Sequence, residues 1–458
     1  MTTEHGADAA PGSPSGSAAN RRPDVVLLIC DQMQAQRLSW GDPSLTPNID
    51  GLAARGATFD RAYCSSAQCT PSRASLQTGL YPHEAGVMVI YGFGGHTGHL
   101  DDRHTTIAHA FSEAGYSTAL FGKSHFGYPI DRLGYDGGVE RGAGSSMAKV
   151  DRQISDDAIE YVADHDPDRP MFLVVSWHQP HPPFEPVEEY LERARDAVEI
   201  PASFDDDLAG RPLYQTARRS HREGSYTEEG LREEQAEYLS MIAAMDHEVG
   251  RVLDAVAARE RESVVAFTSD HGDMMGGHGL RLKGTFPYEE LFRVPLIISA
   301  PQITPGTRVD GLTVNVELPG TLLDLAGVQR PEVWPDRPSV PSVAGGGAGP
   351  EQIFMEHYGS YWGFHPFRMV RTDRYKYVRH YGPGEGDAEL YDLVADPHEM
   401  VNRAYDPDFR PIRDDLHERV DTWWEQTGGR DWKYYESDEF RLGGADTLSW
   451  DNELWAPT

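Results

Sequence analysis

The stretch CTPSRASLQTG, residues 69–79, opens on a cysteine and carries an arginine four residues later. Its Thr-Pro pair suits the start of a helix, and its final glycine suits the end. We expect Thr70 to cap a short helix that runs from Ser72 to Thr78, with Cys69 directly in front of it. The order of residue types therefore predicts that a thiol lies at the mouth of a helix.

Cys69 and Arg73 would lie side by side at that mouth. Free backbone N–H groups at a helix start attract anions, and an arginine one turn on adds a forked donor for a tetrahedral oxyanion. This chemistry suits a sulfate or phosphate ester. An ordinary helix start would explain the threonine, the proline and the glycine, but neither the cysteine nor the arginine.

Reactive polar side chains also follow four short apolar runs. The runs are VVLLIC, STALFG, MFLVVSW and SVVAFTS, at residues 25–30, 117–122, 171–177 and 263–269. After them come Asp31 and Gln32, Lys123 and His125, His178 and His181, and Asp270 and His271. One such pair is often only a turn or a cap, but open α/β sheets bind ligands at the carboxyl ends of their strands. Four pairs at one sheet edge predict a polar binding site.

The elements that must position these residues can be read from the apolar pattern. The four runs, and VPLIIS at 294–299, are continuous rather than alternating, which is typical of strands buried in a parallel or mixed sheet. Helical periodicity lies between them, as in TTIAHAFSEAG at 105–115 and the long segment 233–260. Alternating strands and helices predict a doubly wound α/β fold.

Composition divides the chain into parts. Residues 1–22 are rich in Ala, Gly, Ser and Pro, and we expect a disordered tail. Residues 23–330 would form the main α/β domain, and the Pro/Gly-rich residues 331–350 a linker or surface loop. Residues 351–458 would form a smaller α+β subdomain, in which antiparallel strands precede a helix near 410–426. The pattern contains no internal repeat.

Charge and cysteine content narrow the classes of function. The 458 residues include 41 Lys and Arg against 73 Asp and Glu, a formal charge of −32, which argues against nucleic acid or anionic membrane as partner. Three cysteines make no disulfide framework, and Cys30 and Cys64 are interpreted as buried core residues. Arg21 and Arg22 hint at a twin-arginine signal, but the apolar run after them is short and better suited to a core strand. We expect a cytoplasmic protein; the pattern does not indicate an oligomeric state.

The segment CTPSR, with the Thr-Gly further on, resembles the signature of the type I sulfatase family, Cys-x-Pro-Ser-Arg. Other segments similar to that family follow in its order: GKSH, HQPH, SDHGD, HGLRLKG, RTDRYKYV and ELYDLVADPHEMVN. The resemblance covers roughly residues 24–410. It implies an alkaline-phosphatase-like α/β fold with a mixed sheet, and hydrolysis of small-molecule sulfate esters.

In that family the motif cysteine is oxidised after translation to formylglycine, an aldehyde that hydrates to a geminal diol. By this resemblance Cys69 is the precursor of the nucleophile, and a formylglycine-generating enzyme is a partner. One diol oxygen would attack sulfur, and the other would later expel sulfate by restoring the aldehyde. Such a covalent route divides a hard hydrolysis into two easier steps.

The resemblance also implies roles for five basic residues. Arg73, Lys123 and Lys283 would stabilise charge in the transition state. His125 would help the sulfated diol to collapse, and His181 would donate to the leaving oxygen. His178 has a competing interpretation as a structural residue before the turn.

The same carry-over makes Asp31, Gln32, Asp270 and His271, with the modified Cys69, the ligands of a divalent cation. Gln32 stands where a second aspartate is usual in arylsulfatases, and His271 where asparagine is frequent. A site rich in oxygen ligands favours calcium, whereas an imidazole also suits manganese. We expect calcium, with manganese or magnesium as alternatives.

Two other functions compete with sulfate ester hydrolysis. The first is hydrolysis of phosphonate monoesters or phosphodiesters on the same scaffold, and the Lys123–His125 pair favours the sulfatase branch over it. The second is a degenerate anion-binding relative without activity, which is weakened because no motif position is missing. The aromatic stretches 89–99 and 357–367 would either line the pocket or pack on the core. The sequence does not separate an aryl sulfate, a sulfated sugar and choline sulfate as substrate.

Overall fold

The structure is a computed structural model of the whole chain. It describes residues 22–37, 45–91, 100–144, 146–220, 227–340, 349–360, 363–382 and 386–437. The predicted tail, up to residue 21, lies outside the described residues, as do 341–348 of the predicted linker.

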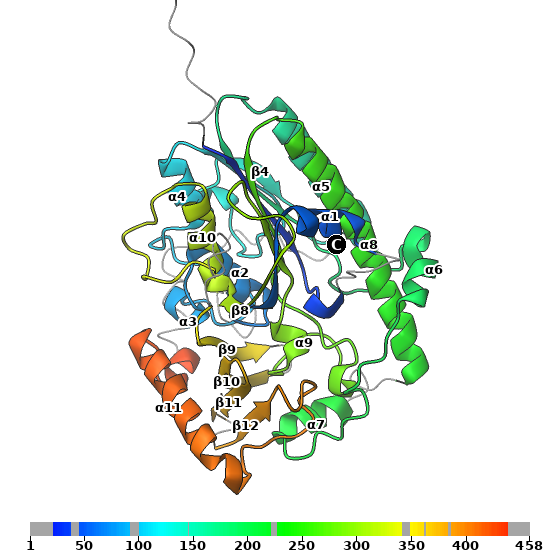
Figure 1. The fold of residues 1–458 in the computed structure, drawn as a ribbon, viewed down its shortest axis with the longest axis vertical. Coiled ribbons are helices and arrows are strands. Elements are labelled where there is room, and N and C mark those ends of the chain that lie inside the picture. The colour runs from blue at the N-terminus through cyan, green and yellow to red at the C-terminus, as the bar shows by residue number, and fades with distance from the viewer. Residues whose placement is uncertain are drawn as a thin grey trace, which may run out of the picture.

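The centre of the molecule is an eight-stranded mixed sheet (Figure 1). In order across the sheet the strands are β4 (Gly137–Glu140), β3 (Ser117–Gly122), β5 (Met171–Ser176), β1 (Asp24–Cys30), β6 (Ser263–Ser269), β7 (Leu296–Ser299), β2 (Ala57–Tyr63) and β8 (Thr307–Val314). β1 pairs in parallel with β5 and β6, whereas β7 runs antiparallel to both of its neighbours. The continuous apolar runs are explained by this position, because the central strands are buried on both faces.

Helices cover both faces of this sheet. On one face lie α2 (Cys69–Thr78), α3 (Pro82–Ala85), α4 (Ile107–Glu113) and α10 (Leu318–Leu325). On the other lie α1 (Pro47–Arg55), α5 (Met147–Asp164), α6 (Glu188–Asp196) and α8 (Glu228–Ala257). Alternate residues of β1 enter the two layers, so that Leu27 packs in the first core and Leu28 in the second. This is the doubly wound arrangement that the sequence predicted.

A second, antiparallel sheet lies below the first in Figure 1. Its order is β12 (Ala388–Asp392), β11 (Tyr375–His380), β10 (Gly363–Thr372) and β9 (Gln352–Ser360). Helix α11 (Arg410–Gln426) packs on one face through Leu416 and Val420. The other face shares a core with the large domain, in which Met369 and Phe292 both take part. Two further short α-helices in the described part of the chain are α7 (Leu213–Ser220) and α9 (Glu289–Phe292).

The described part of the predicted linker is packed rather than free. The Trp334 indole packs against the first core, and its Nε1 donates to the Thr105 carbonyl at 2.8 Å. Val340 is buried in the same core. A surface loop is therefore the better description of residues 331–340, while the division into domains at 331–350 stays a prediction.

The prediction that Thr70 caps its helix is wrong. Helix α2 already begins at Cys69, and Gln68 occupies the N-cap position without a side-chain hydrogen bond to the helix. The Thr70 hydroxyl instead accepts from the backbone N–H of Tyr91 at 3.0 Å and donates to the carbonyl of His125 at 3.3 Å. These long-range partners use the hydroxyl that a cap would need. Gly79 does end the helix, in the left-handed conformation with φ 69°.

None of the helices within the described ranges combines the length and the apolar character needed to cross a bilayer.

Candidate active site

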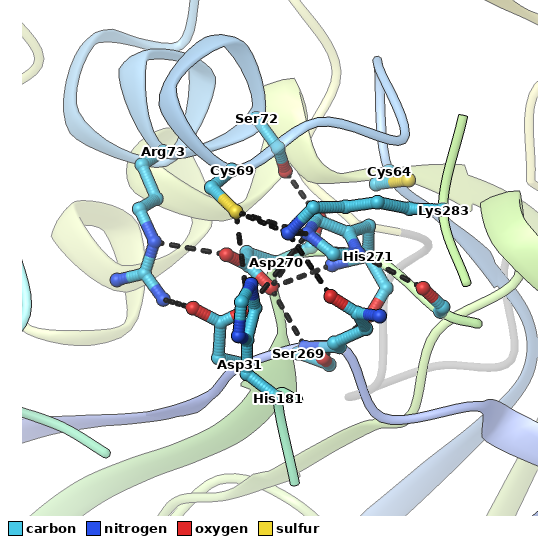
Figure 2. Close-up of polar contacts among 12 residues, drawn as sticks. Asp31, Cys64, Cys69, Ser72, Arg73, His181, Ser269, Asp270, His271 and Lys283 are labelled. Carbon is cyan, nitrogen blue, oxygen red and sulfur yellow. Dashed lines mark hydrogen bonds and ion pairs between the residues drawn. The ribbon is translucent and has the colours of Figure 1, made fainter. Parts of the chain in front are cut away.

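Polar residues that follow the central strands lie together beside Cys69, and Figure 2 shows Asp31, His181 and Asp270 among them. Asp31 comes directly after β1, Lys123 after β3 and Asp270 after β6. These strands are parallel within the β3-β5-β1-β6 segment, so their carboxyl ends share one edge of the large sheet. The first turn of α2 brings Cys69 to the same place.

Cys69 lies at the centre of the cluster and is almost fully buried. Its Sγ is 2.8 Å from Lys283 Nζ, 3.2 Å from His271 Nε2 and 3.8 Å from Lys123 Nζ. Burial alone would raise the pKa of this thiol, but Lys123 and Lys283 outweigh it and hold the pKa well below its usual value. The environment therefore stabilises negative charge at this side chain.

The Arg73 guanidinium is buried and turned toward the carboxylates. Its Nε donates to Asp270 Oδ2 at 2.9 Å and its Nη2 to Asp31 Oδ2 at 3.4 Å. Its Nη1 donates to Ser176 Oγ and to the Lys123 carbonyl, both at 2.8 Å. Arg73 thus fixes the two carboxylates and the end of β3, and its contact with a bound oxyanion stays a prediction.

Two carboxylates, an amide and an imidazole converge beside Cys69. The ligand atoms of Asp31, Cys69, Asp270 and His271 all lie within 4.8 Å of one another. Gln32 Oε1 faces the same group and accepts from Lys283 Nζ at 3.0 Å. This set of donors fits a divalent cation, since carboxylate and amide oxygens with one imidazole are ordinary ligands of such ions.

The candidate ligands are held in place by neighbours outside the cluster. The Gln32 Nε2 donates to Asp273 Oδ2 at 2.5 Å, which points the amide oxygen inward. The ring Nδ1 of His271 lies 2.9 Å from the Gly272 carbonyl, which directs its Nε2 to the cluster. Asp273 belongs to the SDHGD segment, but no role was predicted for it from the sequence.

A cavity of about 240 Å³ opens beside Cys69. Lys123, His125, His181 and Lys283 are among its lining residues. The others are Cys69, Ile90, Glu140, Arg141, Gly142, Ala143 and His178. The cavity is therefore lined by every residue that was predicted to act on the substrate except Arg73, whose guanidinium is turned toward the carboxylates.

The two histidines of the cavity differ in how they are held. His125 Nδ1 is buried and has no hydrogen-bond partner among the described residues. Burial, with help from Lys123, lowers the pKa of His125, which favours the neutral base. His181 Nδ1 lies 2.6 Å from the Pro182 carbonyl, an arrangement that leaves Nε2 for the site. Burial and Lys283 lower the pKa of His181 as well.

His178 is both structural and at the edge of the cavity. Its backbone N–H donates to Asp151 at 2.8 Å, and its Nε2 lies 2.7 Å from the Arg141 carbonyl. Burial lowers its pKa to about 3, so the ring is neutral. These contacts favour the structural interpretation of His178.

Glu140 is one of four cavity residues that were not identified from the sequence; the others are Arg141, Gly142 and Ala143. It ends β4, and its Oε1 accepts from Ser124 Oγ at 2.6 Å and from the backbone N–H of His125 at 3.1 Å. The short strand GGVE gave little signal, because its burial is only partial.

Of the aromatic stretches, the residues that the structure describes contribute little to this cavity. Ile90 is the lining residue from the first stretch, whose residues 92–99 lie outside the described ranges. No described residue of 357–367 lines it, and His357 stacks on Phe367 in the core, at 5.1 Å between ring centroids. Cys30 and Cys64 are buried, as the sequence predicted.

Comparison with known proteins gives this geometry a family. The sulfatase family model matches residues 23–328, two thirds of the chain, and a model for the C-terminal region of N-sulphoglucosamine sulphohydrolase matches residues 276–426. The chain belongs to the sulfatase family. The predicted alkaline-phosphatase-like fold is confirmed, since solved sulfatase structures share it.

Individual relatives span nearly the whole sulfatase. The uncharacterised sulfatase YidJ of Escherichia coli K12 is 30% identical over 444 residues, 87% of this chain and 86% of its own. The choline-sulfatase of Rhizobium meliloti is 29% identical over 442 residues, 84% of this chain and 83% of its own. A solved structure, the phosphonate monoester hydrolase of Agrobacterium radiobacter, superposes with a TM-score of 0.76 at 25% identity and covers 89% of this chain and 96% of its own. The protein is an enzyme that hydrolyses sulfate esters, as the sequence predicted.

Proposed function

We propose that this sulfatase cleaves small sulfate esters with a formylglycine nucleophile made from Cys69 by a formylglycine-generating enzyme. The observation that carries the proposal is the position of Cys69 Sγ, which lies within 4 Å of two ammonium groups and of His271. The thiol stands in for the aldehyde oxygen and its hydrate. A nucleophile placed there meets positive charge on several sides, as an attack on an anionic ester requires.

In the first step, one hydroxyl of the hydrated aldehyde loses its proton to solvent water. Its oxygen forms a bond to sulfur while the bond from sulfur to the ester oxygen breaks. The leaving alcohol oxygen takes a proton from His181 Nε2, which therefore acts as an imidazolium. The anionic ester favours that protonated form, because it adds negative charge beside the ring. Lys123 and Lys283 hold the sulfate oxygens during the transfer.

In the second step, neutral His125 removes the proton of the remaining hydroxyl on residue 69. The carbonyl bond reforms, the bond from carbon to the sulfate oxygen breaks, and sulfate leaves. Water then adds to the aldehyde and restores the diol. The proton on His125 returns through solvent to His181. The sum is one ester anion and one water converted to one alcohol, one sulfate dianion and one proton.

Asp31, Gln32, Asp270 and His271 would hold a divalent cation beside the modified Cys69. When bound, the cation lowers the pKa of the diol and neutralises the sulfate oxygens. We propose calcium, with manganese or magnesium as alternatives, since three of the four side chains offer oxygen.

The cavity favours a compact leaving group. Ile90, Gly142 and Ala143 give it apolar walls, while Glu140 places a carboxylate at its border. A small alcohol that is cationic or rich in hydroxyl groups would satisfy both features. The resemblance to a choline-sulfatase agrees with this size and charge.

Phosphonate monoester hydrolysis is the second candidate, because a phosphonate monoester hydrolase superposes over most of the chain. A comparison of kcat/KM for an aryl sulfate and an aryl phosphonate monoester, on protein made with the formylglycine-generating enzyme, separates the two. We expect the sulfate to be preferred, and Cys69→Ala to hydrolyse neither. A preference for the phosphonate would replace our proposal with the second candidate.

A further inference from the structure

A second group of potential metal ligands lies outside the active site. It consists of His278, Glu290 and Glu399, whose ligand atoms all lie within 4.8 Å of one another. His278 belongs to the short helical turn Gly277–Gly279, Glu290 to α9, and Glu399 to the segment after β12. None of the three borders the cavity beside Cys69.

His278 is oriented as a ligand would be. Its ring is fully buried and stacks on Tyr288, at 3.8 Å between centroids and 19° between planes. Its Nδ1 lies 2.7 Å from Asp206 Oδ2. The Asp206 carboxylate also accepts from Arg211 Nη2 at 2.9 Å and from the backbone N–H of Leu208 at 3.1 Å, so both of its oxygens serve as acceptors. Nδ1 therefore carries the proton and donates it, as in the carboxylate–histidine pairs that support metal ligands.

This assignment leaves His278 Nε2 as a bare lone pair. The atom is buried and has no hydrogen-bond partner among the described residues. The ligand atoms of two carboxylates lie within 4.8 Å of this imidazole, and carboxylate oxygens are themselves acceptors. An unsatisfied buried nitrogen of this kind costs free energy unless a proton or a cation fills the gap.

Of the two carboxylates beside His278, Glu399 has a cationic partner, whereas Glu290 has none among the described residues. Lys376 Nζ pairs with Glu399 and lies 3.5 Å from Glu289 Oε1. Glu289 also has Arg371 at 4.0 Å. Within the part of the chain that the structure describes, Glu290 forms no ion pair, and its nearest hydrogen-bond donor is Ser203 Oγ at 3.5 Å.

The backbone is shaped to admit Glu290. A Cβ on Gly277 would lie 2.7 Å from Glu290 Oε1, so the glycine leaves room for this carboxylate beside the turn that carries His278. Glu290 is also half-buried, which gives an ion a path to the group. Glu399 Oε2 accepts from the backbone N–H of Glu289 at 2.9 Å, which holds the third carboxylate.

We propose that His278 Nε2, Glu290 and Glu399 bind a second divalent transition-metal ion of the zinc class, with Asp206 as the residue that positions the imidazole. One imidazole and two carboxylates, with a water as fourth ligand, suit tetrahedral zinc. The ion would join three segments of the chain and hold the turn that leads to Lys283. Its role is structural, and it is independent of the proposed chemistry at Cys69.

The test counts metal in a protein whose first site has been removed. The Asp31→Asn, Asp270→Asn double variant is stripped with a chelator, dialysed against zinc, and analysed for bound metal with its fold checked by circular dichroism. We expect one zinc per chain in the double variant. Adding His278→Gln or Glu290→Gln should abolish this zinc binding, and adding Asp206→Asn should weaken the zinc affinity about 10–100-fold. The control is His417→Gln, which removes a partly exposed histidine beside Asp421 and should leave the zinc bound.

A folded double variant that binds no zinc would overturn the proposal, and so would zinc binding that His278→Gln leaves unchanged. Should the double variant fail to fold, the wild-type protein and Glu290→Gln are titrated with cobalt and followed by visible absorption. The proposal then requires the wild type to bind one more equivalent of cobalt than Glu290→Gln. Equal cobalt stoichiometry in the two proteins would refute it.

Discussion

Asp273 is expected to act on the active site through Gln32, and Asp273→Asn tests this. Its Oδ2 accepts from Gln32 Nε2 at 2.5 Å and its Oδ1 from the backbone N–H of Met275 at 2.8 Å, in a fully buried position. The substitution keeps the shape but removes the charge that fixes the amide of Gln32. Loss of such an outer partner typically weakens metal affinity about 10–100-fold, or roughly 1.4–2.7 kcal/mol.

The assay is the dependence of sulfatase activity on calcium concentration after chelation. We expect the half-activating concentration to rise about 10–100-fold, with kcat at saturating calcium within about threefold of the wild type. Asp246→Asn is the control, because Asp246 is also buried and accepts from the backbone N–H groups of Asn48 and Ile49. It should lower the free energy of unfolding by about 1–3 kcal/mol and leave the calcium dependence unchanged. An unchanged calcium dependence in Asp273→Asn would refute the reasoning, as would a loss of kcat that excess calcium does not restore.

Three further predictions concern single residues. His125→Ala should release about one equivalent of leaving group and then stop with sulfate retained on residue 69, because the second step lacks its base; steady turnover in a stopped-flow assay would remove His125 from that role. Glu140→Gln should raise KM for a cationic sulfate ester by about tenfold and leave a neutral aryl sulfate unaffected, since about 1.4 kcal/mol of charge attraction is lost; equal effects on both substrates would contradict this role. Burial raises the pKa of Glu317 from 4.5 to about 7, so the folded chain binds its proton more tightly and stability falls as pH rises through that interval. Glu317→Gln should therefore flatten the decline in urea midpoint between those pH values, and an unchanged slope would exclude Glu317 as its source.

Much of the site could be predicted because local sequence fixes it. Asp31, Lys123 and Asp270 directly follow buried strands, and parallel strands must bring their carboxyl ends together. The position of the Cys69 thiol at a helix start could also be predicted, because the residue types around it are typical of a helix start. The helix boundary was wrong by a few residues, because the Thr70 hydroxyl is used by Tyr91 and His125, which are distant in sequence.

The residues that were missed act through contacts that no local pattern records. Asp273 reaches back to Gln32 across more than two hundred residues, and Glu140 ends a short strand with weak periodicity. Arg73 was predicted to contact an oxyanion, and this stays a prediction; in the structure its N–H groups donate to Asp31, Asp270 and Ser176. Tertiary packing decides which hydrogen-bond partners a buried guanidinium has. Local sequence patterns therefore do not predict them.

The most direct test of the proposed nucleophile is the mass of the peptide that contains residue 69, measured alongside kcat. Protein made with the formylglycine-generating enzyme should show a loss of about 18 Da at Cys69, the change from thiol to aldehyde. Across preparations with different degrees of conversion, kcat should rise in proportion to the aldehyde fraction and extrapolate to zero for the unmodified thiol. Full activity in protein that retains the Cys69 thiol would contradict the account.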